Sequence, residues 1–547
     1  MRNLRVNLIF FLILLFSLAI TGRLIYLQIL KGDFYKALSQ GLHSSFNETL
    51  GERGEIFLKD GTPLAINLNF PLVFASPKKI RDFEKTSQIL SEILNLDSNP
   101  PTTQQGKTTY DFILEKLKKD KDKFYSLIKK KLSPEEVEKL KNLSLEGIFI
   151  DEERGRYYPQ ENLASQTVGF LGAEGKGQYG LEESFDNVLI SENGFGKSEK
   201  GTDLILTIDY SIQFEAEKLL ERAKGDLEIE KGEIIVIDPN SGKIIALANF
   251  PNFNPNQYED YAEEGNLEIF KNGVTQELFE PGSVFKPITM AAALNEEKIT
   301  PQTIYRDPGE IKIDGWTIYN YDGRKYPGEI TMTEVLEKSI NTGAVFAQRQ
   351  IPNLVFLEYI KNFGFFEPTG IDLRESYSQN QEINQGREIN FATASYGQGI
   401  NITPIQLARA YCAIANGGKL ITPYLVEEPV EVKPQPEEVI SQKTASQLTA
   451  MLVSVVENGF GNRAKIPGYY IAGKTGTALQ PKIGEGVYSD KTWQTFVGYF
   501  PAFNPKFLIL IKLDNPKTKT AEYSAVPIFH DLAEYIINYW KIPPDYE

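Results

Sequence analysis

Histidine and cysteine are scarce in this chain of 547 residues, and their scarcity excludes two kinds of chemistry. The two histidines are His43 and His530, and neither lies in a nucleophile elbow or in another triad context. A Ser-His-Asp mechanism is therefore all but excluded. The one cysteine, Cys412, cannot form an intrachain disulfide, and the apolar helical segment around it predicts a small buried thiol.

Basic residues are outnumbered by acidic ones, 58 to 73, which gives a net charge of −15. A basic surface is the electrostatic mark of nucleic-acid binding, so this balance argues against a nucleic-acid partner. Acidic surfaces commonly confer solubility alone, so the charge identifies no substrate. The chain shows no internal repeat, and its length allows two or three domains beyond an N-terminal segment.

What the chain does contain is a set of three short motifs in sequence order. They are Ser283-x-x-Lys286, Ser339-x-Asn341 and Lys474-Thr475-Gly476-Thr477. Together they supply a hydroxyl nucleophile, two amines, a second hydroxyl, an amide and two threonines. Such a set is sufficient for acyl transfer through a serine, without histidine and without a metal.

Each motif is weak when taken alone, because the same spacings recur elsewhere. Ser-x-x-Lys also occurs at Ser76/Lys79 and Ser126/Lys129, and Ser-x-Asn also occurs at Ser191/Asn193 and Ser378/Asn380. Context separates two of them from the first motif. Pro77 favours a turn after Ser76, and the lysine-rich run over 116–131 predicts a solvated helix face around Ser126.

The context of Ser283 is different, because a helix should begin beside it. Pro287 lacks an N–H and fits only the first turn of a helix, while Pro281-Gly282 supplies a turn before it. Ser283 and Lys286 then lie on one helical face, with the serine at the positive end of the helix dipole. The alternative is a helix-capping serine followed by a lysine that reaches solvent.

The third motif interrupts a predicted strand over 469–479 with small residues. Glycine within a strand often marks the close approach of another backbone, and an extended substrate could pair along this edge. Alternation places Thr475 and Thr477 on one side, with Lys474 on the other side or turned inward. The alternative is a glycine-broken edge strand with a solvated lysine.

The N-terminus predicts a membrane anchor. Residues 6–22 are apolar apart from Asn7, Ser17 and Thr21, which is at the short end for a membrane span. No Ala-x-Ala cleavage pattern follows, so we expect an uncleaved signal anchor rather than a cleaved signal peptide. The basic tail over 1–5 places the N-terminus in the cytoplasm and the rest of the chain outside the membrane's inner leaflet.

The remainder divides into two predicted modules, 23–200 and 201–547. The first mixes strands such as 73–75 with Lys/Glu-rich helices, one of which starts at Ser133-Pro134 with Glu136 completing a capping box. A surface loop is expected over 100–106 and a linker over 194–201. The second module is predicted to be α+β, with one antiparallel sheet covered by helices. Its expected elements are a strand over 204–209, helices over 211–223 and 526–540, and hairpins formed by 233–237 with 243–248 and by 495–500 with 507–511.

The ordered trio resembles the motifs of the penicillin-binding and serine β-lactamase superfamily, with Ser-Ile-Asn at 339–341 where the family often has Ser-Asp-Asn. Further segments narrow the resemblance to class B penicillin-binding proteins across nearly the whole chain, although Leu58-Lys59 replaces a common Asp-Arg. These segments are 53–57, 60–61, 64–65, 156–159, 180–182, 185–186, 396–400 and 403–408. Glu280-Pro281-Gly282 looks more like the division-type (FtsI-like) branch than the elongation-type branch.

The resemblance implies a fold and a mechanism. Residues 23–200 would form a non-catalytic dimerisation or pedestal domain, and 201–547 a transpeptidase domain. Ser283 would attack the carbonyl between two terminal D-alanines of a stem peptide, with Lys286 as general base and Lys474 as the second cation that favours its neutral form. Further roles would be proton relay by Ser339, amide binding by Asn341, carboxylate binding along Thr475-Gly476-Thr477 with help from Lys474, and an oxyanion hole from the N–H groups of Ser283 and Thr477.

The same resemblance implies partners and leaves rival functions. We expect peptidoglycan stem peptides and β-lactams as ligands, with no metal and no cofactor. Divisome membrane proteins are the expected partners, among them a glycosyltransferase of the shape, elongation, division and sporulation (SEDS) family. The protein would act in septal wall synthesis at the bacterial inner membrane. Alternatives are an elongation-type transpeptidase, a D,D-carboxypeptidase or β-lactam hydrolase, a β-lactam sensor, and a scaffold; a bifunctional glycosyltransferase is excluded.

Overall fold

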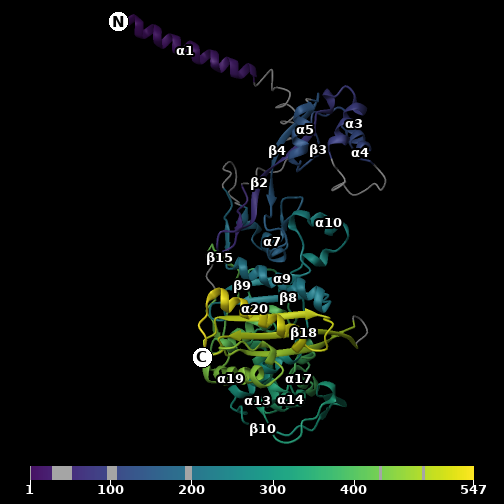
Figure 1. Ribbon diagram of the computed structural model, residues 1–547, viewed down its shortest axis with the longest axis vertical. Helices are drawn as coiled ribbons and strands as arrows, with labels where there is room; N and C mark the ends of the chain where they lie inside the picture. Colours follow the sequence, from purple (N-terminus) through teal and green to yellow (C-terminus); the bar gives the residue numbers. More distant parts are fainter. Residues whose placement is uncertain are drawn as a thin grey trace. The chain divides into compact units, whose positions relative to one another are not determined.

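The computed structural model describes residues 2–26, 52–94, 108–143, 145–190, 200–429, 434–482 and 487–546 (Figure 1). The chain divides into two compact units, one formed by Met1–Gly51 and Asn67–Tyr157, the other by Glu52–Ile66 and Tyr158–Glu547. The expected loop over 100–106 lies outside the described residues, as does most of the expected linker over 194–201. The module boundary at residue 200 stays a prediction.

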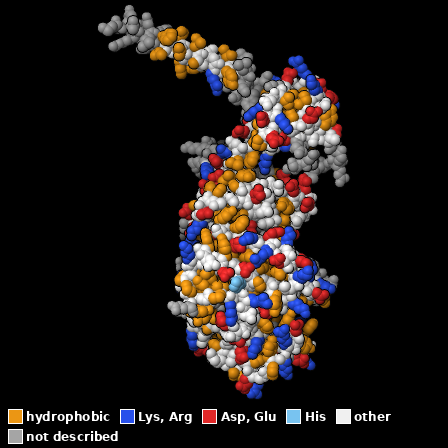
Figure 2. Space-filling view, viewed as in Figure 1, with side chains coloured by type: hydrophobic (Ala, Val, Ile, Leu, Met, Phe, Trp, Pro, Cys, Tyr) orange, Lys and Arg blue, Asp and Glu red, His pale blue; other side chains and the backbone are white. Residues whose placement is uncertain are grey.

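Helix α1 (Arg2–Ile25) covers the segment expected to be an anchor. Apolar side chains lie exposed along it, including Phe11, Leu14 and Phe16 (Figure 2). Within the described ranges, the structure contains no helix that combines the length and the apolar character required to cross a membrane. The anchor over 6–22 stays a prediction.

The rest of the first unit packs helices against a small sheet. Its elements are the second part of β2 (Pro63–Ala75), α3 (Phe83–Ile93), α4 (Thr109–Lys119), β3 (Ser126–Lys129), α5 (Pro134–Leu143) and β4 (Ile148–Tyr157). Val73, Leu90 and Ile128 lie in the core between them. Helix α5 begins as predicted, because the Glu136 N–H donates to Ser133 Oγ and the Ser133 N–H donates to Glu136 Oε2.

The prediction of a solvated helix face around Ser126 is wrong. Residues Ser126–Lys129 form strand β3, which pairs with β2 and buries alternate residues. Ser126 is buried and its hydroxyl donates to Asp120 Oδ2, 2.8 Å away. The lysine-rich sequence does not reveal this alternation of buried and exposed residues, because only Ser126 and Ile128 point inward in so short a strand.

A five-stranded antiparallel sheet organises the second unit, in the order β17-β18-β19-β8-β9. The strands are β17 (Ala472–Pro481), β18 (Tyr488–Phe500), β19 (Phe507–Asp514), β8 (Lys231–Ile237) and β9 (Ile244–Phe250). Both predicted hairpins are present, as β8 with β9 and β18 with β19. The α+β expectation is confirmed.

Alternation along the strands assigns the two faces of this sheet to different helices. Ile234 and Val236 pack with α9 (Tyr210–Leu227) and α20 (Ala525–Trp540). Ile235 and Ile237 belong to a second core together with α12 (Lys286–Asn295), α18 (Pro404–Ala415) and α19 (Gln442–Asn458). Helices α13 (Met332–Glu337), α14 (Asn341–Arg349) and α17 (Glu388–Ala394) gather on the side of the sheet away from α9 (Figure 1). Cys412 lies fully buried in α18, as predicted.

The strand expected to open the second module joins a different sheet. Strand β7 (Leu204–Leu206) pairs in parallel with β1 (Ile56–Phe57) and antiparallel with β15 (Val426–Glu428). Thr207, just after β7, donates its hydroxyl to the carbonyl of Ile244 at 2.6 Å. This hydrogen bond ties the sheet that contains β7 to strand β9.

A buried ion pair fixes the start of β1. The Arg53 guanidinium lies 2.6 Å from Glu182 Oε2 and 2.6 Å from Asp186 Oδ1. Arg53 is 8% exposed and Glu182 is fully buried, and the Tyr158 hydroxyl also lies 3.3 Å from Glu182 Oε1. Charges removed from water to this extent are tolerated only when they are paired and hydrogen-bonded.

We therefore expect Arg53→Met to lower the free energy of unfolding by about 3 kcal/mol, because Glu182 would keep its burial and lose its cation. Arg374→Met is the matched control, since the Arg374–Glu183 pair is 3.4 Å long with side chains 71% and 39% exposed; its cost should stay below about 1 kcal/mol. All three tryptophans lie in the second unit, so urea unfolding of the full-length protein can be followed by their fluorescence. Equal shifts in the two variants would contradict the expectation.

Candidate active site

The first motif forms a helix start that presents Ser283 to Lys286. A single 3-10 turn over Gly282–Phe285 leads directly into α12, so the helix begins beside Ser283 as predicted. Lys286 Nζ lies 3.0 Å from Ser283 Oγ, and the lysine is fully buried. The N-cap positions of the turn and of the helix are occupied by Pro281 and Phe285, not by Ser283. The alternative of a capping serine with a solvent-reaching lysine is therefore wrong.

The turn is supported from behind by a tyrosine that the sequence did not single out. Tyr411 of α18 is fully buried, and its hydroxyl donates to the carbonyl of Val284 at 2.6 Å. Gly282 has a left-handed φ of +58°, and a Cβ there would lie 3.1 Å from Ala478 Cβ. The backbone around Ser283 is thus held closely between α18 and β17.

The second motif supplies the hydroxyl that links the two lysines. Ser339 Oγ lies 3.2 Å from Lys286 Nζ and 3.1 Å from Lys474 Nζ. Its carbonyl oxygen accepts from Lys286 Nζ at 2.6 Å. Ser339 stands between α13 and α14 with a φ of +52°, a conformation that is costly for a residue other than glycine. The structure thus brings one residue from each motif into a single hydrogen-bonded chain.

Burial of the two amines determines their charge. Burial lowers the pKa of Lys286 well below its ordinary value, and the nearby charge of Lys474 lowers it further. Burial alone lowers the pKa of Lys474 to about 7. Among the described residues, no carboxylate forms an ion pair with either lysine. Lys286 is therefore the neutral member of the pair, and Lys474 is the one that can carry charge near neutral pH.

Neutrality gives Lys286 the hydrogen-bonding pattern of a base. A neutral amine has two N–H groups and one lone pair. Its N–H groups can be donated to the carbonyl and hydroxyl oxygens of Ser339, which lie 2.6 and 3.2 Å away. The lone pair is then available to the Ser283 hydroxyl at 3.0 Å. The geometry suits removal of the serine proton.

The third motif lies on β17, which is an edge strand of the five-stranded sheet. Lys474 is fully buried and turned inward, the second of the two expected orientations. A Cβ on Gly476 would lie 2.9 Å from the carbonyl oxygen of Pro281, so glycine allows the close backbone approach that the sequence predicted. Thr475 is nearly buried, and Thr477 Oγ1 accepts from the Ala521 N–H at 3.3 Å.

Asn341 is the first residue of α14, and its side chain already has one fixed partner. Its Nδ2 donates to the carbonyl of Tyr319 at 2.9 Å. Tyr319 ends strand β12 (Trp316–Tyr319), a segment in which the sequence indicated no function. The second N–H of this carboxamide and its oxygen are then the groups that Asn341 can offer to a ligand.

A buried carboxyl group joins the nucleophile segment to two neighbours. Glu280 Oε1 accepts from the Gly399 N–H at 3.2 Å, and the Tyr488 hydroxyl lies 3.0 Å from Glu280 Oε2. Gly397 approaches Gly282 so closely that a Cβ would lie 2.1 Å from the Gly282 oxygen. Burial raises the pKa of Glu280. The segment over 396–400, noted in the sequence for its resemblance, thus packs directly against the turn before Ser283.

Other occurrences of the motif spacings form local environments of their own where the structure describes them. Ser76 Oγ is buried with no hydrogen-bond partner among the described residues. Ser378 and Asn380 hydrogen-bond to each other, from the Asn380 N–H to Ser378 Oγ at 3.1 Å. Ser191 and Asn193 lie outside the described residues.

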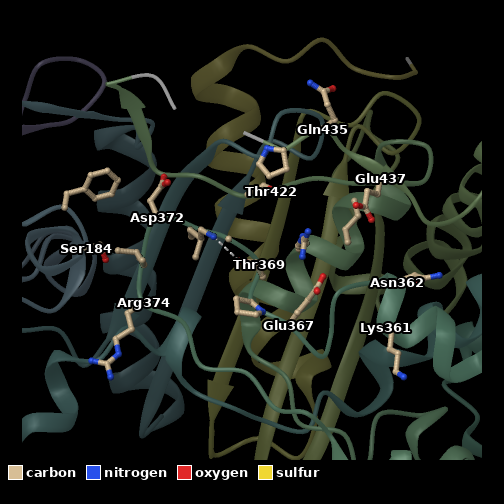
Figure 3. Close-up of a pocket in the computed structure, with 18 of the residues that line it drawn as sticks. Ser184, Lys361, Asn362, Glu367, Thr369, Asp372, Arg374, Thr422, Gln435 and Glu437 are labelled. Atoms are coloured by element: carbon tan, nitrogen blue, oxygen red, sulfur yellow. Dashed lines mark hydrogen bonds between the residues drawn. The ribbon is translucent and has the colours of Figure 1, made fainter. Parts of the chain in front are cut away.

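A cavity of about 1070 Å³ lies elsewhere in the second unit and contains none of the motif residues (Figure 3). Ser184 and Arg374 line one side of it, and Gln435 and Glu437 line another. Asp372 lines it as well, but its carboxylate already accepts from the N–H groups of Leu425 and Val426. The size of this cavity does not make it the place of acyl transfer.

Comparison with known proteins gives matches over both parts of the chain. Residues 232–534 match the family model of the penicillin binding protein transpeptidase domain, and residues 48–203 match that of the penicillin-binding protein dimerisation domain. Stage V sporulation protein D of Bacillus subtilis is 31% identical over 91% of this chain and 80% of its own length. A probable peptidoglycan D,D-transpeptidase, PbpC, of Pseudomonas aeruginosa is 31% identical over 100% of this chain and 96% of its own.

Among solved structures, penicillin binding protein 3 of Mycobacterium tuberculosis in complex with aztreonam is similar, with a TM-score of 0.70 and 26% identity. The match covers 90% of this chain and 97% of that one.

The shifted pKa values predict how acylation of Ser283 depends on pH. We expect the second-order rate constant for a donor that carries a carboxylate to fall as the pH rises above about 7, because the free enzyme then loses the charge on Lys474. Burial and the nearby charge of Lys474 hold the pKa of Lys286 well below its ordinary value, so the expected fall is assigned to Lys474. A matched donor with the carboxylate methylated should show no such fall. Mass spectrometry of the acylated protein from about pH 6 to about pH 9 measures both rates; parallel profiles would contradict the assignment of charge to Lys474.

Proposed function

Because the chain belongs to the class B penicillin-binding proteins, we propose that Ser283 is the nucleophile through which it cross-links peptidoglycan stem peptides. The family makes it a serine-type peptidoglycan D,D-transpeptidase. One observation carries the assignment of residues: a continuous chain of contacts runs from Ser283 Oγ through Lys286 Nζ and Ser339 Oγ to Lys474 Nζ.

The first half of the proposed reaction acylates Ser283. Its Oγ attacks the carbonyl between two terminal D-alanines, and its proton passes to the neutral Lys286. The oxyanion is held by the N–H groups of Ser283 and Thr477, each worth roughly 10²–10³ in rate. The C–N bond then breaks, and the leaving D-alanine amine takes a proton by way of Ser339. Support for that relay comes from the Ser339 hydroxyl, which lies within 3.2 Å of both amines.

The second half transfers the acyl group. The amine of a neighbouring stem peptide attacks the ester carbonyl and forms a new amide. The amine's proton returns through the lysine–serine chain to Ser283 Oγ, which leaves as the restored hydroxyl. Lys474, Thr475 and Thr477 are proposed to bind the donor's terminal carboxylate, and Asn341 its amide. A hydrolase would use the same first half and pass the acyl group to water.

Covalent β-lactam binding is part of the proposal, because a strained cyclic amide would acylate Ser283 by the same first step without a leaving group that diffuses away. We further propose a septal role in a bacterial inner membrane, with a SEDS-family glycosyltransferase and other divisome membrane proteins as partners. Glu280-Pro281-Gly282 before the nucleophile supports the division-type assignment. An elongation-type role is the second candidate.

The nucleophile is tested by labelling with fluorescent penicillin. We expect a covalent band for the wild-type protein and none for Ser283→Ala. Ser76→Ala is the matched control, because Ser76 has the same Ser-x-x-Lys spacing and its buried hydroxyl lacks a partner among the described residues, so its loss should change neither labelling nor folding. Equal labelling of Ser283→Ala would overturn the assignment.

The same protein separates transferase from hydrolase. With a thioester acyl donor, added D-alanine or glycine amine should divert most product from the free acid to the amide. Release into water that no amine diverts would instead favour the carboxypeptidase alternative.

The proposed anchor and septal role are tested with a fluorescent fusion at the C-terminus. We expect the full-length chain to remain in the membrane fraction after an alkaline carbonate wash and to form a ring at the division site. Replacement of residues 6–22 by a cleavable export signal should release the protein and abolish the ring. A signal spread along the lateral wall would favour the elongation role, and one confined to a developing spore would favour a sporulation role.

A further inference from the structure

Three buried polar side chains meet beside the second motif and take no part in the mechanism above. They are Asp307, Asn320 and Thr342, which are 7%, 4% and 0% exposed. Asp307 follows strand β10 (Ile304–Tyr305), Asn320 follows β12, and Thr342 is the second residue of α14. We call these three residues the polar hub. Buried polar groups in such number are retained only when their hydrogen bonds are satisfied.

The carboxylate of Asp307 is the centre of the polar hub. Its Oδ1 accepts from the Gly309 N–H at 2.9 Å and lies 2.8 Å from Thr342 Oγ1. Its Oδ2 accepts from Asn320 Nδ2 and from the Tyr326 N–H, both at 2.9 Å. Both oxygens therefore have two partners, and these partners come from three separate stretches of the chain.

Asn320 joins the polar hub to the start of helix α14. Its Oδ1 accepts from the Thr342 N–H at 3.1 Å, and its Nδ2 also donates to the Arg324 carbonyl at 3.0 Å. The residue in the capping position of α14 is Ile340, which has no side chain that can cap. Asn320 thus supplies from a distant segment the cap that the helix lacks.

The contact that orients Asn341 lies one residue away. Tyr319 and Asn320, consecutive at the end of β12, bind Asn341 and Thr342, consecutive at the start of α14. Asn341 Nδ2 must face the Tyr319 carbonyl, because a carboxamide turned by half a rotation would place its own oxygen against the carbonyl oxygen of Tyr319. Ile318 of β12 also packs with Ala344 and Val345 of α14, and the polar hub adds the hydrogen bonds that fix the Tyr319 carbonyl against the carboxamide.

We propose that Asp307 and Asn320 are positioning residues for the acyl-transfer reaction, which act by holding the carboxamide of Asn341 in its binding orientation. They hold the segment over 306–329, which includes β12, against the first turn of α14. The proposal rests on the proposed role of Asn341 in binding the amide of the acyl donor. It predicts a defect that depends on whether the donor has such an amide.

Two β-lactams provide that distinction. Benzylpenicillin carries an acylamino side chain, whereas 6-aminopenicillanic acid has a bare amine at the same position, and both carry the carboxylate. For Asn320→Ala in the full-length protein, we expect the second-order rate constant of acylation by benzylpenicillin to fall about tenfold. A loss of this size corresponds to the free energy of roughly one hydrogen bond. The rate constant for 6-aminopenicillanic acid should change less than about twofold. A general loss of packing would lower both rates alike.

A double-mutant cycle tests whether the effect passes through Asn341. Asn341→Ala should show the same selective loss, and Asn320→Ala/Asn341→Ala should lose no more than Asn341→Ala alone. Equal losses for both donors, no loss in Asn320→Ala, or losses that add in the double variant would each overturn the proposal. Failure of the wild-type protein to react with either donor would instead refute the proposed acylation by β-lactams.

A second pair of variants keeps the test open if Asn320→Ala does not fold. Thr342→Val removes the hydroxyl beside Asp307 while it keeps the shape of the side chain, and Thr342→Ser keeps the hydroxyl. We expect the benzylpenicillin-selective loss in Thr342→Val and near wild-type rates in Thr342→Ser. The same loss in both variants, or in neither, would contradict the proposal.

Discussion

The burial of two lysines around one serine is the constraint on which the site depends. Lys286 and Lys474 are both fully buried, and Ser339 Oγ lies within hydrogen-bond distance of each amine. Two buried like charges would be strongly unfavourable, and the pKa of Lys286 is lowered well below its ordinary value by burial and by Lys474, which is what its proposed role as a base requires. The surrounding fold must therefore keep both water and carboxylates away from these amines. It does so by packing the edge strand β17, the start of α12 and Ser339, whose φ is left-handed, against one another.

Close backbone packing is what brings these parts together. The Gly476–Pro281 and Gly397–Gly282 approaches leave no room for a Cβ on Gly476 or Gly397, and Tyr411 holds the turn from the opposite side. The sheet and its two helical layers provide the rigid frame, while the reacting groups stand on a strand edge and on helix starts. Rigid elements of this kind hold catalytic groups more accurately than loops do.

Local patterns predicted much of this arrangement. Three predicted features depend only on neighbours within a few residues, and the structure contains all three. They are the helix start at Ser283, the capping box of Ser133 and Glu136, and the inward orientation of Lys474. The helix prediction for Ser126 fails because strand β3 has only four residues and its inward positions alternate with lysine-rich sequence. The polar hub could not be predicted, because Asp307, Asn320 and Thr342 have no shared spacing and meet only when strand ends fold onto α14.

Strand β17 has a free edge, and what such an edge offers to a ligand is mainly backbone. A donor or inhibitor that pairs there is recognised through backbone groups, which a substitution leaves in place unless the new residue is proline. Resistance to an inhibitor of this site would therefore arise less easily on β17 itself than in the elements that contact the ligand's side chain. The segment that carries Trp316 and Tyr319, both largely exposed, meets the carboxamide of Asn341 through the Tyr319 carbonyl, so its side chains can change while that backbone contact stays.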